Sequence, residues 1–462
     1  MPLSSRVQFL RNLLLLPGMS AAENTGVQAI VRPTFAEAFR FWLKLGFISF
    51  GGPGGQIAIM HAELVERKKW IGESHFLHAL NYCMLLPGPE ATQLAIYAGW
   101  LLHKTWGGIV AGALFVLPSA FILWALSYVY AAYGDVAWIA AIFCGLKPAV
   151  IAIVASAVIR IGRQALKNEV MCAIAGLAFA SLFFFHVPFP AVVMAAGIIG
   201  LIGGNLWRDK FLVIGADALT GNDAGLAGNR HAGTGARDKT SPWRGLRVAA
   251  VCIVAWWMPT LLAGLLLGWQ HTVTQEGIFF SKAAVVTFGG AYAVLPYVSQ
   301  QAVTHFGWLG APQMLDGLGL AETTPGPLIM VLQFVGFLGG WNHPGGLPRL
   351  LAATLGAAIT TWSTFAPCFL WIFLGAPHIE RLRGNVKLTA ALSAITAAVV
   401  GVILNLAVWF ALNSWFPKPG SVDWFAIAVS LLAFTVIVKW KWGIIPVIAS
   451  AAALGLFYKL IF

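Results

Sequence analysis

Charged residues are scarce in this sequence. Asp, Glu, Lys and Arg make up only 10% of the 462 residues, whereas soluble domains carry about 25%. Hydrophobic residues make up 59%, and the mean hydropathy is +0.80. This composition excludes a soluble domain and predicts an all-α integral membrane protein in contact with membrane lipid, because apolar helices satisfy their own backbone inside a bilayer.

Signatures of catalysis and of metal binding are missing as well. The five Cys residues form no Cys-x-x-Cys pair, and the ten His residues show no metal-ligand spacing. No Walker A motif, dinucleotide fingerprint or Gly-x-Ser-x-Gly elbow occurs. We therefore expect no metal, no cofactor and no ATP-driven transport. The net charge of +12 arises from Lys and Arg in short loops, as the positive-inside rule predicts, so we expect no nucleic-acid partner.

The sequence is instead rich in repeated helix breakers. Pro-Gly-Pro occurs at 87–89 and again at 325–327, an offset of 238 residues. The same offset relates three further pairs: Lys44 and Lys282, Phe50-Gly51-Gly52 and Phe288-Gly289-Gly290, and Trp70 and Trp308. Inside a bilayer such breaks are tolerated only where protein or a watery cavity satisfies the freed backbone groups. Matching interrupted segments in two halves of a chain indicate the binding site of a transporter.

The apolar pattern divides the chain into about thirteen segments, of which the first two in each half are interrupted. From this we predict four regions: a cytoplasmic N-terminal tail (1–33), a first membrane repeat (34–206), a cytoplasmic linker (207–243), and an extra span followed by the second membrane repeat (244–462). Six segments and the extra span precede the second repeat, so its orientation should be opposite to that of the first.

Loop charges support this inverted topology. Basic residues mark the loops that follow the fourth, tenth and twelfth segments as cytoplasmic: Arg160, Arg163 and Lys167, then Arg381, Arg383 and Lys387, then Lys439 and Lys441. The third segment and its counterpart then cross in opposite directions, which is an inverted repeat. The loop Arg67-Lys68-Lys69 favours re-entrant hairpins for the interrupted segments, although full spans remain an alternative.

The run from Phe50 to Gln56 contains four Gly and one Pro. Consecutive Gly let backbone N–H groups converge on an anion, and a broken helix adds a positive amino end. The alternative is close helix packing through small residues.

Polar side chains near the breaks are the second set of candidates. Lys44 and Lys282 are candidates for anion contact, with snorkelling toward the interface as the alternative. Glu90 follows the first Pro-Gly-Pro and Glu322 precedes the second. Acids at membrane depth are candidates for ion coupling, although helix capping is the simpler role.

These residues resemble a known family. Residues 44–53 with Gln56, and 86–89 with Gln93, are similar to the signature of the chromate ion transporter family. Residues 287–292 and 324–327 extend the resemblance to the second half, as in long, two-domain members. In that half Ala291 and Val294 replace Pro53 and Gln56, so the two halves are not expected to be equivalent.

The resemblance implies a multi-pass protein of the bacterial plasma (inner) membrane that exports chromate from the cytoplasm, driven by an ion gradient or by anion exchange. It also implies sulfate as a competitor, and a homodimer is possible. Two alternatives stay open: a transporter of another oxyanion such as sulfate, and an integral membrane enzyme that acts on a lipid-linked substrate. An enzyme would need a juxtamembrane nucleophile or metal cluster, which the sequence does not offer.

The candidate site therefore combines the residues of the breaks with the flanking polar groups. The predicted substrate-binding residues are Lys44, Gly51, Gly52, Pro53, Gly54, Gln56, Pro87, Gly88, Pro89, Gln93, Lys282, Thr287, Gly289, Gly290, Thr323, Thr324, Pro325, Gly326 and Pro327, and the predicted coupling residues are Glu90 and Glu322.

Overall fold

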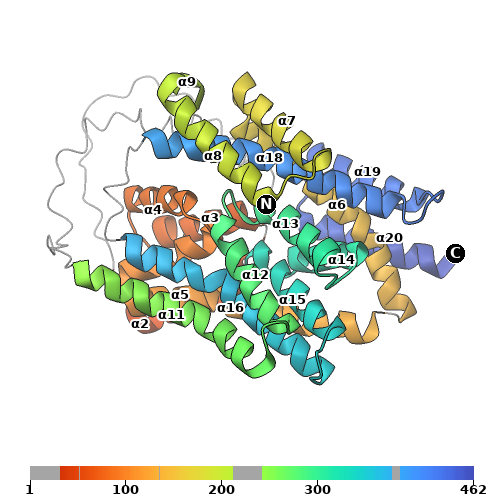
Figure 1. Ribbon diagram of the computed structural model, residues 1–462, viewed down its shortest axis with the longest axis horizontal. Helices are drawn as coiled ribbons and strands as arrows, with labels where there is room; N and C mark the ends of the chain where they lie inside the picture. Colours follow the sequence, from red (N-terminus) through yellow and green to blue (C-terminus); the bar gives the residue numbers. More distant parts are fainter. Residues whose placement is uncertain (1–31, 51, 135, 212–241, 377–385, 462) are drawn as a thin grey trace.

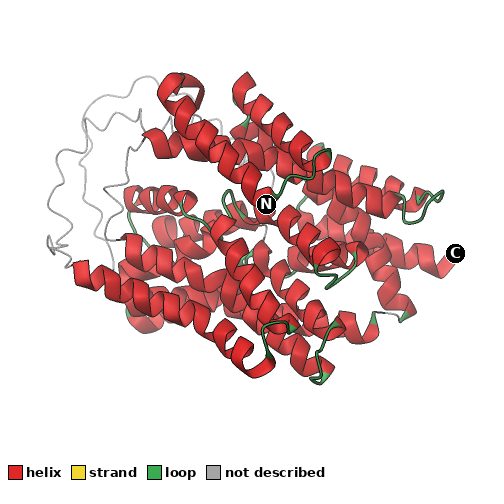
Figure 2. Ribbon diagram, viewed as in Figure 1, coloured by secondary structure: helices red, strands yellow, loops and turns green. Residues whose placement is uncertain are grey.

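A computed structural model describes residues 32–50, 52–134, 136–211, 242–376 and 386–461. Every regular element in these ranges is a helix, and the described residues contain no strand (Figure 2). Within the described ranges, seven helices are long and apolar enough to cross a membrane, and three shorter ones are also apolar. The expectation of an all-α membrane protein is therefore confirmed. Most of the predicted tail and linker, together with Arg381 and Arg383, lies outside the described residues.

The first half begins with three short helices that surround the two predicted breaks. Its elements are α2 (Phe35–Ile48), α3 (Gly52–His61), the π-helical turn η1 (Ala62–Arg67), α4 (Glu73–Leu85), α5 (Glu90–Tyr133), α6 (Ala137–Ala165), α7 (Glu169–Phe183), α8 (Phe189–Leu206) and α9 (Arg208–Phe211).

The second half is built from a similar series. Its elements are α11 (Pro242–Leu267), α12 (Thr272–Val286), α13 (Ala291–Gln300), the π-helical turn η3 (Gln301–His305), α14 (Ala311–Thr323), the 3₁₀ turn η4 (Leu328–Met330), α15 (Val331–Asn342), α16 (Arg349–Gly375), α18 (Val386–Trp415), α19 (Trp424–Val438) and α20 (Ile444–Ile461).

The helix bounds follow the offset seen in the sequence. Both ends of α4 and α14 are separated by the same 238 residues as the two Pro-Gly-Pro tripeptides. Helices α3 and α13 match to within one residue, and each runs directly into a π-helical turn. The correspondence thus extends from sequence to local structure. The opposite membrane orientation of the two halves stays a prediction.

The two halves are intertwined rather than side by side (Figure 1). Helices α7 and α8 of the first half pack against α18 of the second, and α19 and α20 of the second pack against α6 of the first. The long helices also meet directly, α6 against α18 and α5 against α16. This exchange brings the breaks of both halves to one junction.

The Gly-rich break is shorter than the sequence predicts. The chain leaves α2 at Ser49, and α3 already begins at Gly52. The run from Gly52 to Gly55 is therefore the first turn of a helix rather than an irregular segment. Pro is well tolerated at the start of a helix, where its missing N–H has no intrahelical partner to lose. Pro53 therefore begins α3 rather than breaking it.

The predicted boundary between the segments near 75–102 and 107–131 is present inside α5. Glu90–Tyr133 consists of two helices joined at His103 and Lys104, whose φ and ψ are not helical, and Gly99 of the first helix packs against Gly107 and Ala111 of the second. At the matching place in the second half, the chain leaves α15 at Asn342 and begins α16 at Arg349.

The helices around the breaks are too short to cross a bilayer alone. Helix α2 has 14 residues and α4 has 13, which at about 1.5 Å per residue is ~20 Å. The hydrocarbon core is about 30 Å thick. These lengths favour re-entrant hairpins, which remain a prediction.

Candidate functional site

The two Pro-Gly-Pro tripeptides lie across a shared junction. The Gly88 N–H donates to the Thr287 carbonyl at 2.7 Å, and the Gly326 N–H donates to the Ser49 carbonyl at 2.7 Å. Thr287 is the counterpart of Ser49, and Gly326 is the counterpart of Gly88. Each tripeptide therefore holds the carboxyl end of a helix in the opposite half, α12 for Gly88 and α2 for Gly326. Such reciprocal pairing is what a two-fold relation produces.

Glycine is required at the centre of both tripeptides. Gly88 has φ of 119° and Gly326 has φ of 106°, a region that side chains with a Cβ rarely adopt. A Cβ at Gly326 would collide with Ser119 of α5, and a Cβ at Gly88 would meet the Gln93 amide and the Cys368 sulfur. The tripeptides thus place their backbones directly against the long helices α5 and α16.

Two buried glutamines brace the junction from the first half only. The Gln56 amide donates to the Gly326 carbonyl at 2.5 Å, and the Gln93 amide donates to the Pro87 carbonyl at 2.7 Å. Both side chains are at most 1% exposed. In the second half valines stand at the matching positions, Val294 and Val331, so this bracing is asymmetric.

The predicted threonine donors are engaged within their own helices. The Thr287 hydroxyl donates to the Ala283 carbonyl at 2.7 Å. Thr323 donates to Leu320 at 2.8 Å, and Thr324 donates to Ala321 at 3.1 Å. In this conformation these hydroxyl protons are directed at backbone carbonyls rather than at the junction.

The amino end of α3 is open. Gly52, with φ of 69°, and Gly54 have free space where a side chain would lie. The first N–H groups of a helix have no intrahelical partner, so Gly52 and Gly54 present donors there, whereas Pro53 cannot. Gly51 lies outside the described residues.

A cavity of about 10 Å³ lies beside this helix end, which is room for about one water molecule. Residues from both halves line it: Pro53, Gln56, Pro89, Glu90, Ala91, Ala291, Pro327, Leu328 and Ile329. The structure therefore brings Pro53, Gln56, Pro89, Pro327 and the predicted coupling residue Glu90 together.

The amino end of α13 is closed by acids and a tyrosine. An oxygen of Glu90 lies 3.9 Å from the position that a Cβ would take at Gly290, the N-cap of α13. In the first turn of α13 the Tyr292 hydroxyl donates to the Glu322 carboxylate. Arg160 of α6 lies close enough to place its positive charge near both Tyr292 and Glu322.

Sequence reasoning did not single out Tyr292 and Arg160. Tyr292 occupies the position that matches Gly54 in the first half, and this exchange of glycine for tyrosine was the signal that could have revealed it. Arg160 was used only as a marker of a cytoplasmic loop. Its contact with Tyr292 depends on α6 reaching the second half, which no local pattern reveals.

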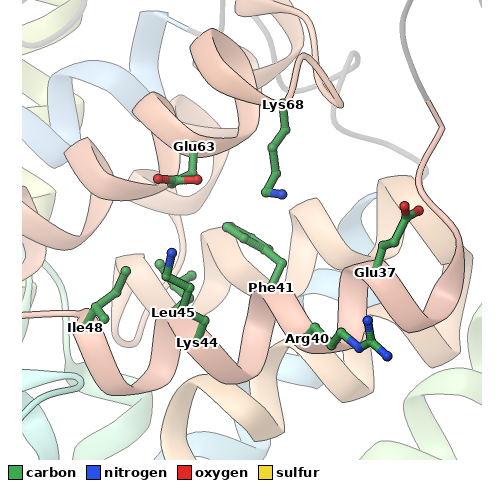
Figure 3. A pocket seen from close by; sticks show the side chains of 8 residues that line it. All are labelled: Glu37, Arg40, Phe41, Lys44, Leu45, Ile48, Glu63 and Lys68. Atoms are coloured by element: carbon green, nitrogen blue, oxygen red, sulfur yellow. The ribbon is translucent and has the colours of Figure 1, made fainter.

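The two predicted lysines lie away from the tripeptides. Lys44 and Lys282 are exposed on α2 and α12. Lys44 points into an open pocket of about 270 Å³ between α2 and the helical segment that carries Glu63 and Lys68 (Figure 3). The residues that line this pocket are different from those that line the small cavity.

Among the charged side chains that line the Lys44 pocket, the acidic ones already have partners, whereas basic ones are left unpaired. Glu63 is paired with Arg67 at 2.6 Å, and Glu37 is held in the capping box of α2. Lys44 and Lys68 form no ion pair with any described residue. The pocket can therefore attract an anion, although Lys68 also lies 4.7 Å from the Trp70 ring.

Comparison of the sequence with known proteins identifies a family and several relatives. A family profile described as Chromate transporter matches residues 36–201 and 274–456. The chain is 28% identical to the chromate transport protein of Cupriavidus metallidurans over 434 residues, 91% of this chain and 92% of that protein. It is 29% identical to the chromate transport protein of Pseudomonas aeruginosa over 443 residues, 94% of this chain and 95% of that protein.

A third relative is the probable chromate transport protein of Synechococcus elongatus, which is 27% identical over 89% of this chain and 92% of its own length. No solved structure matches the chain significantly. The two stretches matched by the profile contain the two sets of broken helices that meet at the junction. The chain therefore belongs to the chromate transporter family.

Proposed function

We propose that this protein is a secondary transporter that exports chromate from the cytoplasm across the bacterial inner membrane, coupled to an ion gradient or to anion exchange. Membership of the chromate transporter family and similarity to chromate transport proteins support chromate as the cargo. The multi-pass helical architecture supports transport rather than catalysis. The single observation that carries the site assignment is the open, glycine-lined amino end of α3 at the junction of the two halves.

Chromate is a tetrahedral dianion, and the α3 end suits such a ligand. The free N–H groups of Gly52 and Gly54 and the positive end of the helix favour negative charge. The absence of side chains at Gly52 and Gly54 lets an oxyanion approach the backbone closely. Gln56 is the nearest amide that could turn from the Gly326 carbonyl toward the bound oxyanion.

The junction must open before chromate can bind. A space that holds about one water molecule cannot hold an ion with four oxygen atoms. Opening requires the tripeptide at 325–327 to separate from Ser49 and Gln56, which breaks two interhalf hydrogen bonds. The reciprocal pair at Gly88 and Thr287 would provide a second closure, as alternating access requires.

Glu90 is suited to couple ion movement to transport. It lines the same cavity that would receive the dianion. Two like charges in a confined site oppose each other, so protonation of Glu90 favours chromate binding, and chromate binding favours protonation by the same factor. Glu322 is the second proposed coupling residue, held by Tyr292 and Arg160.

The site assignment is tested by Gly54→Ala in purified protein reconstituted into liposomes. The added methyl group covers the open face of α3, and we expect the KM for chromate to rise about tenfold, equivalent to ~1.4 kcal/mol. Gly176→Ala is the matched control, because Gly176 also lies in a helix with free space around its Cβ position. Unchanged chromate KM in Gly54→Ala would contradict binding at this helix end.

The same liposomes separate chromate from other oxyanions. Sulfate shares the tetrahedral dianionic shape, and we expect it to compete with chromate for the α3 end. If sulfate is carried with a much higher kcat/KM than chromate, the alternative of a transporter for another oxyanion replaces the chromate proposal.

A further inference from the structure

Glu276 of α12 is a buried carboxyl group that has no role in the proposed site. Its side chain is 0% exposed, and neither carboxyl oxygen has a hydrogen-bond partner among the residues that the structure describes. One oxygen packs against Gly339 of α15 and the other packs against Gly356 of α16. The carboxyl group therefore lies at the crossing of three helices, enclosed by glycine backbone.

The surrounding elements offer Glu276 no neutralising charge. Helix α12 packs against α11, α13, α15 and α16. The ionisable groups on these helices and on α12 itself are Arg244, Arg247 and Cys252 on α11, Tyr292 and Tyr297 on α13, Arg349 and Cys368 on α16, and Lys282 on α12. In the described part of the chain, none of them forms an ion pair or hydrogen bond with Glu276.

Asp316 is a second buried acid, and it has the polar partners that Glu276 lacks. Asp316 of α14 is 2% exposed, but Lys147 lies 3.4 Å from its carboxylate and the Tyr130 hydroxyl donates to it at 2.8 Å. Glu276 has neither kind of partner. An unpaired ion in a dry interior is far more costly than a neutral carboxylic acid, so Glu276 must be neutral in this conformation.

The helix packing itself does not require a carboxyl group at this place. The matching residue of α2 is Ala38, which is 3% exposed. A methyl group thus satisfies the same position in the first half. An acid that the scaffold does not need, in the interior of a membrane protein, indicates function.

We propose that Glu276 is a proton-binding site that carries a proton in this closed conformation and releases it when α12 separates from the α15–α16 crossing. The bound proton forms the O–H bond of the carboxylic acid, and its release leaves a carboxylate and a hydrated proton. This proposal rests on the proposed transport function, and it identifies the proton as a coupling ion with a carrier separate from Glu90 and Glu322.

The protonation state is tested without transport, by infrared spectroscopy of the purified full-length protein at neutral pH. We expect Glu276→Gln to remove a carbonyl band of a neutral carboxylic acid that the wild type shows. Glu169→Gln is the matched control, since the Glu169 side chain is exposed at the start of α7, and we expect it to leave that band in place. No band loss in Glu276→Gln would overturn the proposal.

Coupling is tested in liposomes with Glu276→Gln, which mimics the protonated side chain. We expect exchange of chromate for chromate to continue, whereas the extra accumulation driven by an imposed pH gradient is lost. Accumulation equal to that of wild type, loss of exchange in a folded variant, or a sodium gradient that replaces the pH gradient would each overturn the proposal.

A misfolded Gln variant and a wild type without chromate transport are each distinguished from failure of the Glu276 proposal. If the Gln variant does not yield monodisperse protein, Glu276→Ala takes its place, because alanine occupies the matching position in α2. If the wild type moves no chromate at all, the proposed function fails, and the infrared band still decides whether Glu276 carries a proton.

Discussion

The amino ends of α3 and α13 hold matching places in the two halves but differ in chemistry. The α3 end is lined by Gly52 and Gly54 and has free space. The α13 end meets Glu90 and is covered by the bond between Tyr292 and Glu322. Backbone breaks are shared by both halves, whereas the charged and aromatic groups are not. Under the proposed function, the α3 end presents the anion site, whereas the α13 end meets one acid from each half, Glu90 and Glu322, which oppose the anion or couple to it.

The surroundings of Trp70 and of its counterpart Trp308 show the same divergence. Lys68 lies over Trp70 in the first half, where the 270 Å³ pocket is open. Its counterpart Phe306 stacks on Trp308 with ring centroids 4.3 Å apart. Aromatic packing therefore takes the place of the charged pocket in the second half.

The largest expected effect tests whether the two tripeptides are equally constrained. Gly326→Ala forces a side chain into positive φ and against the Ser119 Cβ, and we expect a loss of about 2–5 kcal/mol in unfolding free energy. Gly88→Ala meets mainly the flexible end of Gln93, and we expect only about 1–2 kcal/mol. Denaturation of the purified proteins measures both.

A second substitution gives this prediction a control. Ser119→Gly removes the obstructing Cβ, so it should recover part of the stability lost in Gly326→Ala and none of that lost in Gly88→Ala. Equal losses in the two Ala variants would mean that contacts with the long helices do not distinguish the tripeptides.

An intermediate effect is expected at the closed α13 end. Tyr292→Phe leaves the buried Glu322 carboxyl group without its tyrosine donor, which should cost about 1.5–3 kcal/mol of unfolding free energy. Tyr297→Phe on the same helix is the control and should change little, because no described residue hydrogen-bonds the Tyr297 hydroxyl. Equal stability of the two variants would show that this bond does not close the α13 end.

The smallest effect is expected at the Lys68 pocket. Lys68→Phe copies the second half and removes one exposed charge, so the KM for chromate at low ionic strength should rise about two- to fivefold, with kcat unchanged. The difference should vanish at high salt, where exposed charges are screened. A KM that differs from wild type equally at low and high salt would exclude an electrostatic role for Lys68.

Sequence reasoning located the breaks and the residues that form the junction, because Pro and Gly act on their own backbone. Gly88 and Gly326 were predicted on that basis, and both have positive φ at the interhalf contact. The start of α3 at Gly52 was not predicted, since a Pro that breaks a helix interior is compatible with its first turn. Lys44 and Lys282 were predicted to contact an anion at a common site, whereas the structure exposes them on two separate helices. That exposure depends on helix packing, which the spacing of residues in the sequence does not reveal.

Composition and the 238-residue offset by themselves determined an all-α membrane protein with two matching sets of broken helices. Both features depend on chemistry that each residue carries locally: apolarity, a missing N–H or a missing Cβ. Only the tertiary structure decided which helices of one half pack against the other half, and therefore which side chains meet. Tyr292 reaches Glu322 of α14, Asp316 gains Lys147 of α6, and Glu276 has no hydrogen-bond partner among the described residues, because the packing of whole helices decides which side chains become neighbours.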